Sequence, residues 1–182
     1  MSEGKRIQNC TLRLVIQDIT DFEVEAFVFY AEPNLALGSG YGSAIARRGG
    51  SSIKAELDKI GSLPKTEAVV TAGGSLKAKY VVHAVGPAFQ EEQTESKLRT
   101  TLINALKRAE EKGVHQIALP LMGVGFYAIP LATSSRVMMA TLEEYLSQGS
   151  GLNEIYICAN DAREYRAFQK AFESAPGESI GA

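Results

Sequence analysis

The sequence is poor in cysteine and has no cluster of metal-binding side chains. Its two cysteines, Cys10 and Cys158, form neither a CxxC pair nor a group with the histidines. This spacing argues against a zinc site and against a secreted disulfide scaffold. We therefore expect no metal ion and no cofactor, because a chain of this length buries enough surface to fold without either.

Long apolar runs and basic runs are also missing. No apolar run approaches the ~20 residues of a membrane span, and the N-terminal MSEGKRIQNC lacks the apolar core of a signal peptide. The 19 basic and 21 acidic residues give a net charge of −2, and no basic run exceeds two residues. No global positive field attracts duplex nucleic acid. We expect a cytoplasmic protein with neither a membrane nor a duplex as partner.

Length and composition fit one domain. The chain has 182 residues, of which 45% are hydrophobic, and domains centre on roughly 100–150 residues. We predict a single domain over 1–182 with a core from about 11 to 173. The ends, 1–8 and 174–182, are polar or glycine-rich and are expected to fray. The predicted helices leave no apolar stripe uncovered, so we expect a monomer or a weak dimer.

Short β-branched runs alternate with longer segments of helical period, which predicts an α/β layer fold. Runs such as VVHAV and IALPL are apolar almost throughout, as expected of strands covered on both faces. His83, inside VVHAV, is expected to be a hydrogen-bonded structural residue. The predicted strands are 11–17, 24–30, 65–72, 80–85, 116–121 and 154–158. The predicted helices are 43–60 (with a break at Gly49-Gly50), 94–112, 131–148 and 162–173.

This order of elements predicts a mixed, largely parallel sheet of about six strands with helices on both faces. Ligands of such sheets lie at the carboxyl ends of the strands. Two glycine-rich segments fall there, GSGYGS at 38–43 and GVGFYA at 123–128. Glycines allow positive φ and let backbone N–H groups converge on an anion, which the positive end of the next helix also attracts. The loops predict a shared diphosphate cradle or, alternatively, plain connections with glycines for turn geometry.

Two other nucleotide-binding motifs fit less well. Neither loop contains the Gly-Lys-Ser/Thr element of a P-loop. Both loops approach the GxGxxG dinucleotide fingerprint, but the connection 31–37 is too long for its tight first turn. Pro130 also starts the second helix beyond the glycines and not among them. A nicotinamide-type oxidoreductase is therefore the weaker interpretation.

Five segments, in order, resemble the macro domains, a family that binds ADP-ribose. The most specific is TAGGSLKAKYVVHAVGP at 71–87, which is similar to the family's T-x-G-x-x-L-x-x-K-Y-V-I-H-x-V-G-P. The resemblance covers about 11 to 172 and implies a three-layer α/β/α fold. The other four segments are QDIT (17–20), LGSGYGSAI (37–45), PLMGVGFYAIP (120–130) and IYICAND (155–161).

The resemblance also implies a binding site. Asp18 would accept a hydrogen bond from the adenine amino group beside the N–H of Ile19; a turn or helix-cap role is the alternative for Asp18. The two loops would wrap the diphosphate and distal ribose, with Tyr127 against that ribose. The family's adenine-stacking aromatic falls on Ala159 or Asn160. The implied ligand-binding residues are Asp18, Ile19, Ser39, Gly40, Tyr41, Gly42, Ser43, Gly123, Val124, Gly125, Phe126, Tyr127 and Asn160.

The resemblance breaks at the side chains that hydrolase-type members use. Their N-A-A-N asparagines fall on Phe29 and Glu32, and their loop acid falls on Gly42. Proton transfer needs a titratable group within reach of the reacting atoms. Glu32 is the one catalytic candidate nearby, and a turn-capping or solvated role before Pro33 is the favoured interpretation.

The sequence therefore predicts a module that binds ADP-ribose or a related derivative, including ADP-ribosylated protein. Without the adenine stack, which is worth ~1–3 kcal/mol, we expect micromolar or weaker binding. The alternative is a hydrolase or phosphatase of ADP-ribose 1″-phosphate, O-acetyl-ADP-ribose or ADP-ribosylated side chains. A third hypothesis is another ligand, because Phe29 and Tyr41 make the distal-ribose end bulkier and more apolar.

Overall fold

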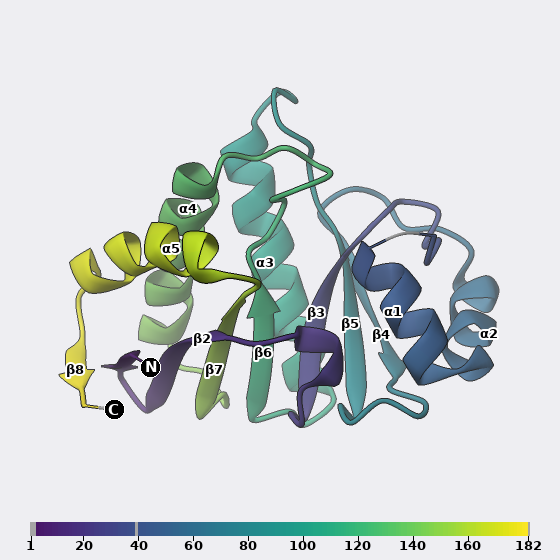
Figure 1. Cartoon of the computed structure of the whole chain (residues 1–182), viewed down its shortest axis with the longest axis horizontal. Coiled ribbons are helices and arrows are strands. Elements are labelled where there is room, and N and C mark those ends of the chain that lie inside the picture. The colour runs from purple at the N-terminus through teal and green to yellow at the C-terminus, as the bar shows by residue number, and fades with distance from the viewer. Residues whose placement is uncertain (1–2, 39, 182) are drawn as a thin grey trace.

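A mixed sheet runs through the whole molecule, with helices on both of its faces (Figure 1). The structure is a computed structural model that describes residues 3–38 and 40–181. The strands lie in the order β4-β5-β3-β6-β7-β2-β1-β8, and β5, β3, β6, β7 and β2 are parallel. Their bounds are β1 Glu3–Ile7, β2 Cys10–Ile16, β3 Ala26–Ala31, β4 Ala68–Ala72, β5 Tyr80–Val85, β6 Gln116–Pro120, β7 Glu154–Ala159 and β8 Glu178–Ile180.

The helices form two layers, each with its own core. Leu102 of α3 and Met138 of α4 pack in one core with strand residues such as Val82. Ile53 of α2 packs in the other core with Val81, the neighbour of Val82 along β5. Among the described residues, no helix has the length and hydropathy needed to cross a bilayer. The bounds are η1 Ile19–Asp21 (a 3-10 turn), α1 Gly40–Gly49, α2 Ser51–Ile60, α3 Thr94–Glu111, α4 Leu131–Ser147 and α5 Ala162–Ser174.

The predicted layer architecture is confirmed, and so is the break in the first long helix. Gly50 has φ +81°, in the left-handed region that favours glycine, and α2 begins at the next residue. Each of the predicted strands is present, although the segment predicted from 65 becomes a strand only at Ala68. The expected number of about six strands is wrong, because β1 and β8 extend the sheet to eight.

Within the described residues, two strands, β1 and β8, form in the end segments that the sequence predicts to fray. β1 pairs antiparallel with β2 and with β8, so both termini lie at the same edge of the sheet (Figure 1). The Lys5 side chain of β1 is 3% exposed. Its Nζ donates to the carbonyl oxygens of Phe172 (2.6 Å) and Ala175, at the C-terminal end of α5. The ends are therefore held by an edge ladder and by a buried ammonium that local composition does not reveal.

The point at which β3 and β6 separate determines where the candidate site lies. β3 pairs with β5 at six positions, from Ala26 to Ala31. It pairs with β6 at only two, Ala26↔Ile117 and Phe27↔Ala118. Beyond Phe27 the two parallel strands separate, and the sheet is open at its carboxyl edge.

Candidate functional site

A cleft of about 280 Å³ lies at the carboxyl edge of the sheet, where β3 and β6 separate. Its walls come from the ends of β3 and β6, from the loops that follow them, and from the starts of η1, α1 and α5. It therefore lies at the carboxyl ends of the strands, where ligands of such sheets are expected. The lining residues are Ile19, Phe27, Val28, Phe29, Tyr30, Glu32, Ala36, Gly38, Gly40, Tyr41, Pro120, Leu121, Gly123, Val124, Gly125, Phe126, Tyr127, Asn160 and Glu164.

Both glycine-rich loops reach this cleft and present backbone N–H groups. In the second loop, Gly123 and Gly125 have φ of +75° and +85°, which an L side chain adopts only with strain. Within the described ranges, the N–H groups of Gly123, Gly125, Phe126 and Tyr127 have no hydrogen-bond acceptor in the protein. The first turn of α1, which starts at Gly40, likewise leaves its N–H groups unpaired by helix geometry. Residues of both loops that have unpaired N–H groups thus line one cleft.

The structure brings most of the predicted ligand-binding residues together, but not all. Asp18, Gly42 and Ser43 are not among the cleft-lining residues, and Gly42 is buried. Ser39 lies outside the described residues. The predicted residues that line the cleft are Ile19, Gly40, Tyr41, Gly123, Val124, Gly125, Phe126, Tyr127 and Asn160, together with the catalytic candidate Glu32.

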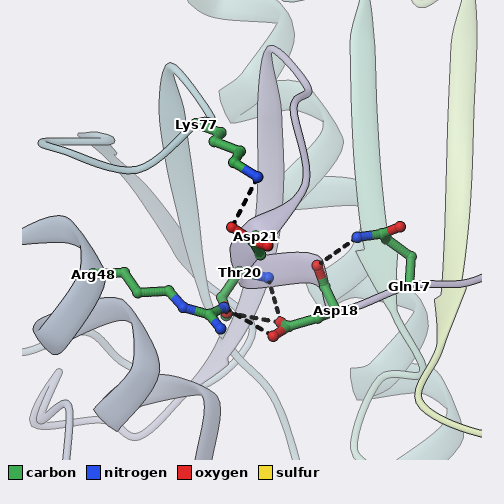
Figure 2. A network of polar contacts seen from close by, with 6 residues as sticks. All are labelled: Gln17, Asp18, Thr20, Asp21, Arg48 and Lys77. Atoms are coloured by element: carbon green, nitrogen blue, oxygen red, sulfur yellow. Dashed lines mark hydrogen bonds and ion pairs between the residues drawn. The ribbon is translucent and has the colours of Figure 1, made fainter.

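Asp18 takes part in a polar network beside the cleft, which Figure 2 shows. Its Oδ1 caps η1 by accepting from the N–H (3.0 Å) and the hydroxyl (2.7 Å) of Thr20. Its Oδ2 accepts from Arg48 of α1 at 2.8 Å. Partial burial alone would raise the pKa of Asp18, but the bonds from Arg48 and Thr20 hold it below its ordinary value. Lys77 pairs with Asp21 at 3.0 Å on the same turn. The network keeps Asp18 ionised and fixes the turn that places Ile19 in the cleft.

Aromatic side chains line the part of the cleft between the end of β3 and the loop after β6. The Tyr30 hydroxyl donates to the Pro87 carbonyl at 2.5 Å, and its ring meets the Tyr127 ring at a centroid distance of 4.7 Å. Burial, and then the charge of Glu32, raise the pKa of Tyr127. A Cβ atom at Gly42 would lie 3.1 Å from Cζ of Phe29. Phe29 therefore occupies the space into which a side chain at position 42 would extend.

The charged groups of the cleft are acidic. Glu32 and Glu164 line it, and no lysine or arginine does so within 3–38 and 40–181. An anionic ligand would therefore depend on backbone N–H groups and on the α1 N-terminus. No group of three or more His, Cys, Asp or Glu side chains in that part of the chain is arranged to hold a metal ion.

Neither cysteine offers a reactive thiol to the site. Cys10 and Cys158 are free and buried. Burial raises the pKa of Cys158 to about 12, so the thiolate that acts as a nucleophile is not formed near neutral pH.

Sequence reasoning missed Glu164, which lines the cleft from the first turn of α5. The pattern Asp161-x-x-Glu164 is a signal for a helix start, and Asp161 does accept from the Glu164 N–H at 2.8 Å. That local pattern contains nothing about the cleft, because the α5 start reaches it only through the pairing of β7 with β6. Tyr165, the residue after Glu164, packs against the core that includes α3, α4 and α5 and does not line the cleft.

His83 lies in β5 beside the aromatic end of the cleft, and its structural role is confirmed. It is fully buried, its Nε2 lies 2.9 Å from the Thr71 hydroxyl, and its ring meets Phe29 edge to face. Burial lowers the pKa of His83 to about 4, from an ordinary value of 6.5. It is therefore neutral at pH 7.

The free energy of unfolding is expected to fall by about 2 kcal/mol between pH 7 and pH 5 because of His83. The unfolded state binds a proton below pH 6.5 and the folded state only near pH 4, so stability rises with pH within this window. Urea unfolding at both pH values tests this, with His83→Gln as the variant that removes the titration. Equal pH dependence in both proteins, or an NMR titration of the His83 ring near pH 6.5, would contradict it.

Comparisons with known proteins agree with this fold. The family model of the macro domain matches residues 30–138. A macro domain-containing protein of Caldanaerobacter subterraneus is 36% identical over 168 residues, which are 89% of this chain and 95% of the relative. A second one, from Cupriavidus necator, is 33% identical over 165 residues, 87% of this chain and 95% of the relative. The chain belongs to the macro domain family.

Solved structures show the same architecture. The Oceanobacillus iheyensis macrodomain with ADP superimposes with a TM-score of 0.90 at 23% identity, over 95% of each chain. The Trypanosoma brucei macrodomain in complex with ADP-ribose has a TM-score of 0.83 at 25% identity, over 88% of this chain and 68% of that one. The three-layer α/β/α fold is thus shared, with eight strands in the part of this chain that the structure describes.

Proposed function

We propose that this chain binds ADP-ribose or a closely related ADP-ribose derivative in the cleft between β3 and β6. The observation that carries the proposal is the convergence of unpaired N–H groups from the 123–127 loop and the α1 start on one cleft. Such groups are the usual ligands of phosphate oxygens in proteins. Related macrodomains have been solved with ADP and with ADP-ribose, which supports the same ligand class here.

The remaining predicted contacts follow from the geometry of the cleft. Ile19 and Asn160 line the cleft near Asp18, because Ile19 follows Asp18 in the chain and Asn160 follows β7, which pairs with β2. Phe126 and Tyr127 line the cleft from the loop after β6. Asp18 Oδ2 accepts one bond from Arg48, so this oxygen keeps a further acceptor position for an amino group of the base. We place the base near Asp18 and the distal ribose near Tyr127.

The binding test compares two glycines that have similar positive φ angles. Gly125 (φ +85°) lines the cleft and Gly149 (φ +91°) lies after α4, and a Cβ atom at either would meet nothing within 4 Å. We expect calorimetry to give micromolar binding of ADP-ribose, with weaker binding of AMP, ADP and NAD. Gly125→Val should weaken ADP-ribose binding by about tenfold or more, a loss of about 1.4 kcal/mol.

Gly149→Val is the control for backbone strain, because it carries the same penalty away from the cleft. It should bind ADP-ribose like the wild type. Equal losses in both variants would assign the effect to strain, and the absence of heat with every ligand would refute the proposal for this cleft.

A hydrolase or phosphatase of ADP-ribose derivatives is the second candidate function. It is favoured by the position of Glu32, which lines the cleft close enough to Tyr127 to raise its pKa. Phe29 and Gly42 supply no titratable group, so turnover would depend on Glu32 as the proton-transfer group. Product release from ADP-ribose 1″-phosphate or O-acetyl-ADP-ribose, abolished by Glu32→Gln, would establish this activity. Binding without product would leave the chain a binding module.

Partners and location are proposed from the sequence. We propose that the chain acts as one domain, a monomer or weak dimer in the cytoplasm, and that ADP-ribosylated protein is a further ligand. Gel filtration at two concentrations and calorimetry with an ADP-ribosylated peptide test these points.

A further inference from the structure

Near Asp18 the cleft is lined by a second carboxylate, to which the proposed function assigns no role. Glu164 is 8% exposed and lines the cleft, as does Asn160, the residue before the start of α5. Both lie at the carboxyl end of β7, the strand that neighbours β2 and the Asp18 turn. A buried glutamate facing a ligand cleft is uncommon, because charged side chains are seldom buried unless paired.

Hydrogen bonds fix the direction of this carboxylate. Glu164 Oε2 accepts from the Asn160 backbone N–H at 2.7 Å, and its own N–H donates to Asp161 at 2.8 Å. This arrangement resembles a capping box, and it accounts for the hydrogen bond of one of the two carboxylate oxygens. The other oxygen, Oε1, has only the Asn160 side-chain amide at 3.5 Å, a distance at which a hydrogen bond is weak. Oε1 is thus an acceptor with unused capacity on a side chain that lines the cleft.

Tyr41 lies near both Glu164 and Asp18. Burial raises the pKa of the Tyr41 hydroxyl, and the charges of Glu164 and Asp18 raise it further, in that order. Both carboxylates therefore lie within electrostatic reach of one phenol that lines the cleft. Three of the acceptor positions of Asp18 are already taken by Thr20 and Arg48. Glu164 is the less committed of the two carboxylates.

We propose that Glu164 accepts one N–H of the amino group of the ligand's base, the other N–H being accepted by Asp18, a role that rests on the proposed function of the cleft. A carboxylate only accepts hydrogen bonds, so it pairs with the N–H groups of an amino substituent. A site built around such a bond rejects an analogue that lacks the donor, because the buried acceptor is then unpaired. Recognition at this end depends on hydrogen bonding, where an aromatic stack would accept any base.

The test is a thermodynamic cycle that removes the Glu164 charge, the amino group of the ligand, or both. Calorimetry compares ADP-ribose with its analogue in which unsubstituted purine replaces adenine, for the wild type and for Glu164→Gln. The glutamine keeps the volume and can still accept the bond from Asn160. We expect the wild type to prefer ADP-ribose by about tenfold and Glu164→Gln to prefer it by about threefold, because Asp18 still accepts one N–H of the amino group. Glu173→Gln, which removes the same charge at the far end of α5, should keep the full preference.

The outcomes separate this inference from the proposed function. If ADP-ribose does not bind the wild type, the proposed function fails and the inference falls with it. If ADP-ribose binds but the purine analogue binds equally well, the inference is overturned by the wild type alone. An unchanged preference in Glu164→Gln would also overturn it, since a residue that only caps α5 would alter the melting temperature and not the choice of base.

Discussion

Replacing Gly42 by aspartate, the acid that hydrolase-type macro domains carry at this position, is expected to destabilise the fold by about 3 kcal/mol or more. A Cβ atom there would lie 3.1 Å from the Phe29 ring and 3.1 Å from the Leu37 Cα atom, before any carboxylate is added. The new charge would also be buried against an aromatic ring. Urea denaturation measures the loss, and no hydrolytic activity should appear.

Gly38→Asp is the matched control for this substitution. Gly38 lies in the loop just before α1, lines the cleft, and a Cβ atom there would meet nothing within 4 Å. Its aspartate should change the free energy of unfolding by no more than about 0.5 kcal/mol. Equal losses at the two positions would show that the loop, and not the Phe29 ring, limits what position 42 accepts.

The same contact predicts that Phe29 and Gly42 are coupled. In Phe29→Asn the ring is gone, so Gly42→Asp should cost less than it does in the wild type. The coupling energy from the double-mutant cycle is expected to be about 1–2 kcal/mol, in the range for residues in contact. Such coupling would mean that Phe29 and Gly42 depart from the hydrolase pattern together, because the large ring at position 29 requires the small residue at position 42.

Lys5→Met is expected to lower the free energy of unfolding by about 2–4 kcal/mol. The buried ammonium donates to the carbonyl groups of Phe172, Glu173 and Ala175, and it lies 5.7 Å from the Phe172 ring centroid. These carbonyls end α5, where a cation also interacts favourably with the helix dipole. Methionine fills the space but leaves the carbonyl groups without a donor. Urea unfolding and amide exchange of 172–180 report the loss.

Lys54→Met is the control for loss of a lysine. The Lys54 side chain is 71% exposed and pairs with Asp58 on the surface of α2, where such pairs contribute little. It should leave stability within about 0.5 kcal/mol of the wild type. A Lys5→Met loss no larger than the Lys54→Met loss would show that water satisfies the α5 carbonyls and that β1 contributes only its ladder.

Local signals were sufficient for the architecture and for the position of the cleft. The alternation of apolar runs and helical periods defines which segments are strands and helices, because those periods reflect contacts within one element. Gly50 ends a helix by its own conformational freedom, and the glycines of the 123–128 loop adopt positive φ for the same reason. The order of strands and helices then places both loops at one edge of the sheet.

What the tertiary structure alone decided are the contacts between residues far apart in the chain. Arg48 meets Asp18 across 30 positions, and Lys5 meets the end of α5 across 167. Glu164 has a helix-start pattern in sequence and becomes a cleft residue only when β7 pairs beside β6. Periodicity describes which way a side chain faces on its own element. Which partner it meets there depends on packing between elements, and that packing determines the chemistry of this site.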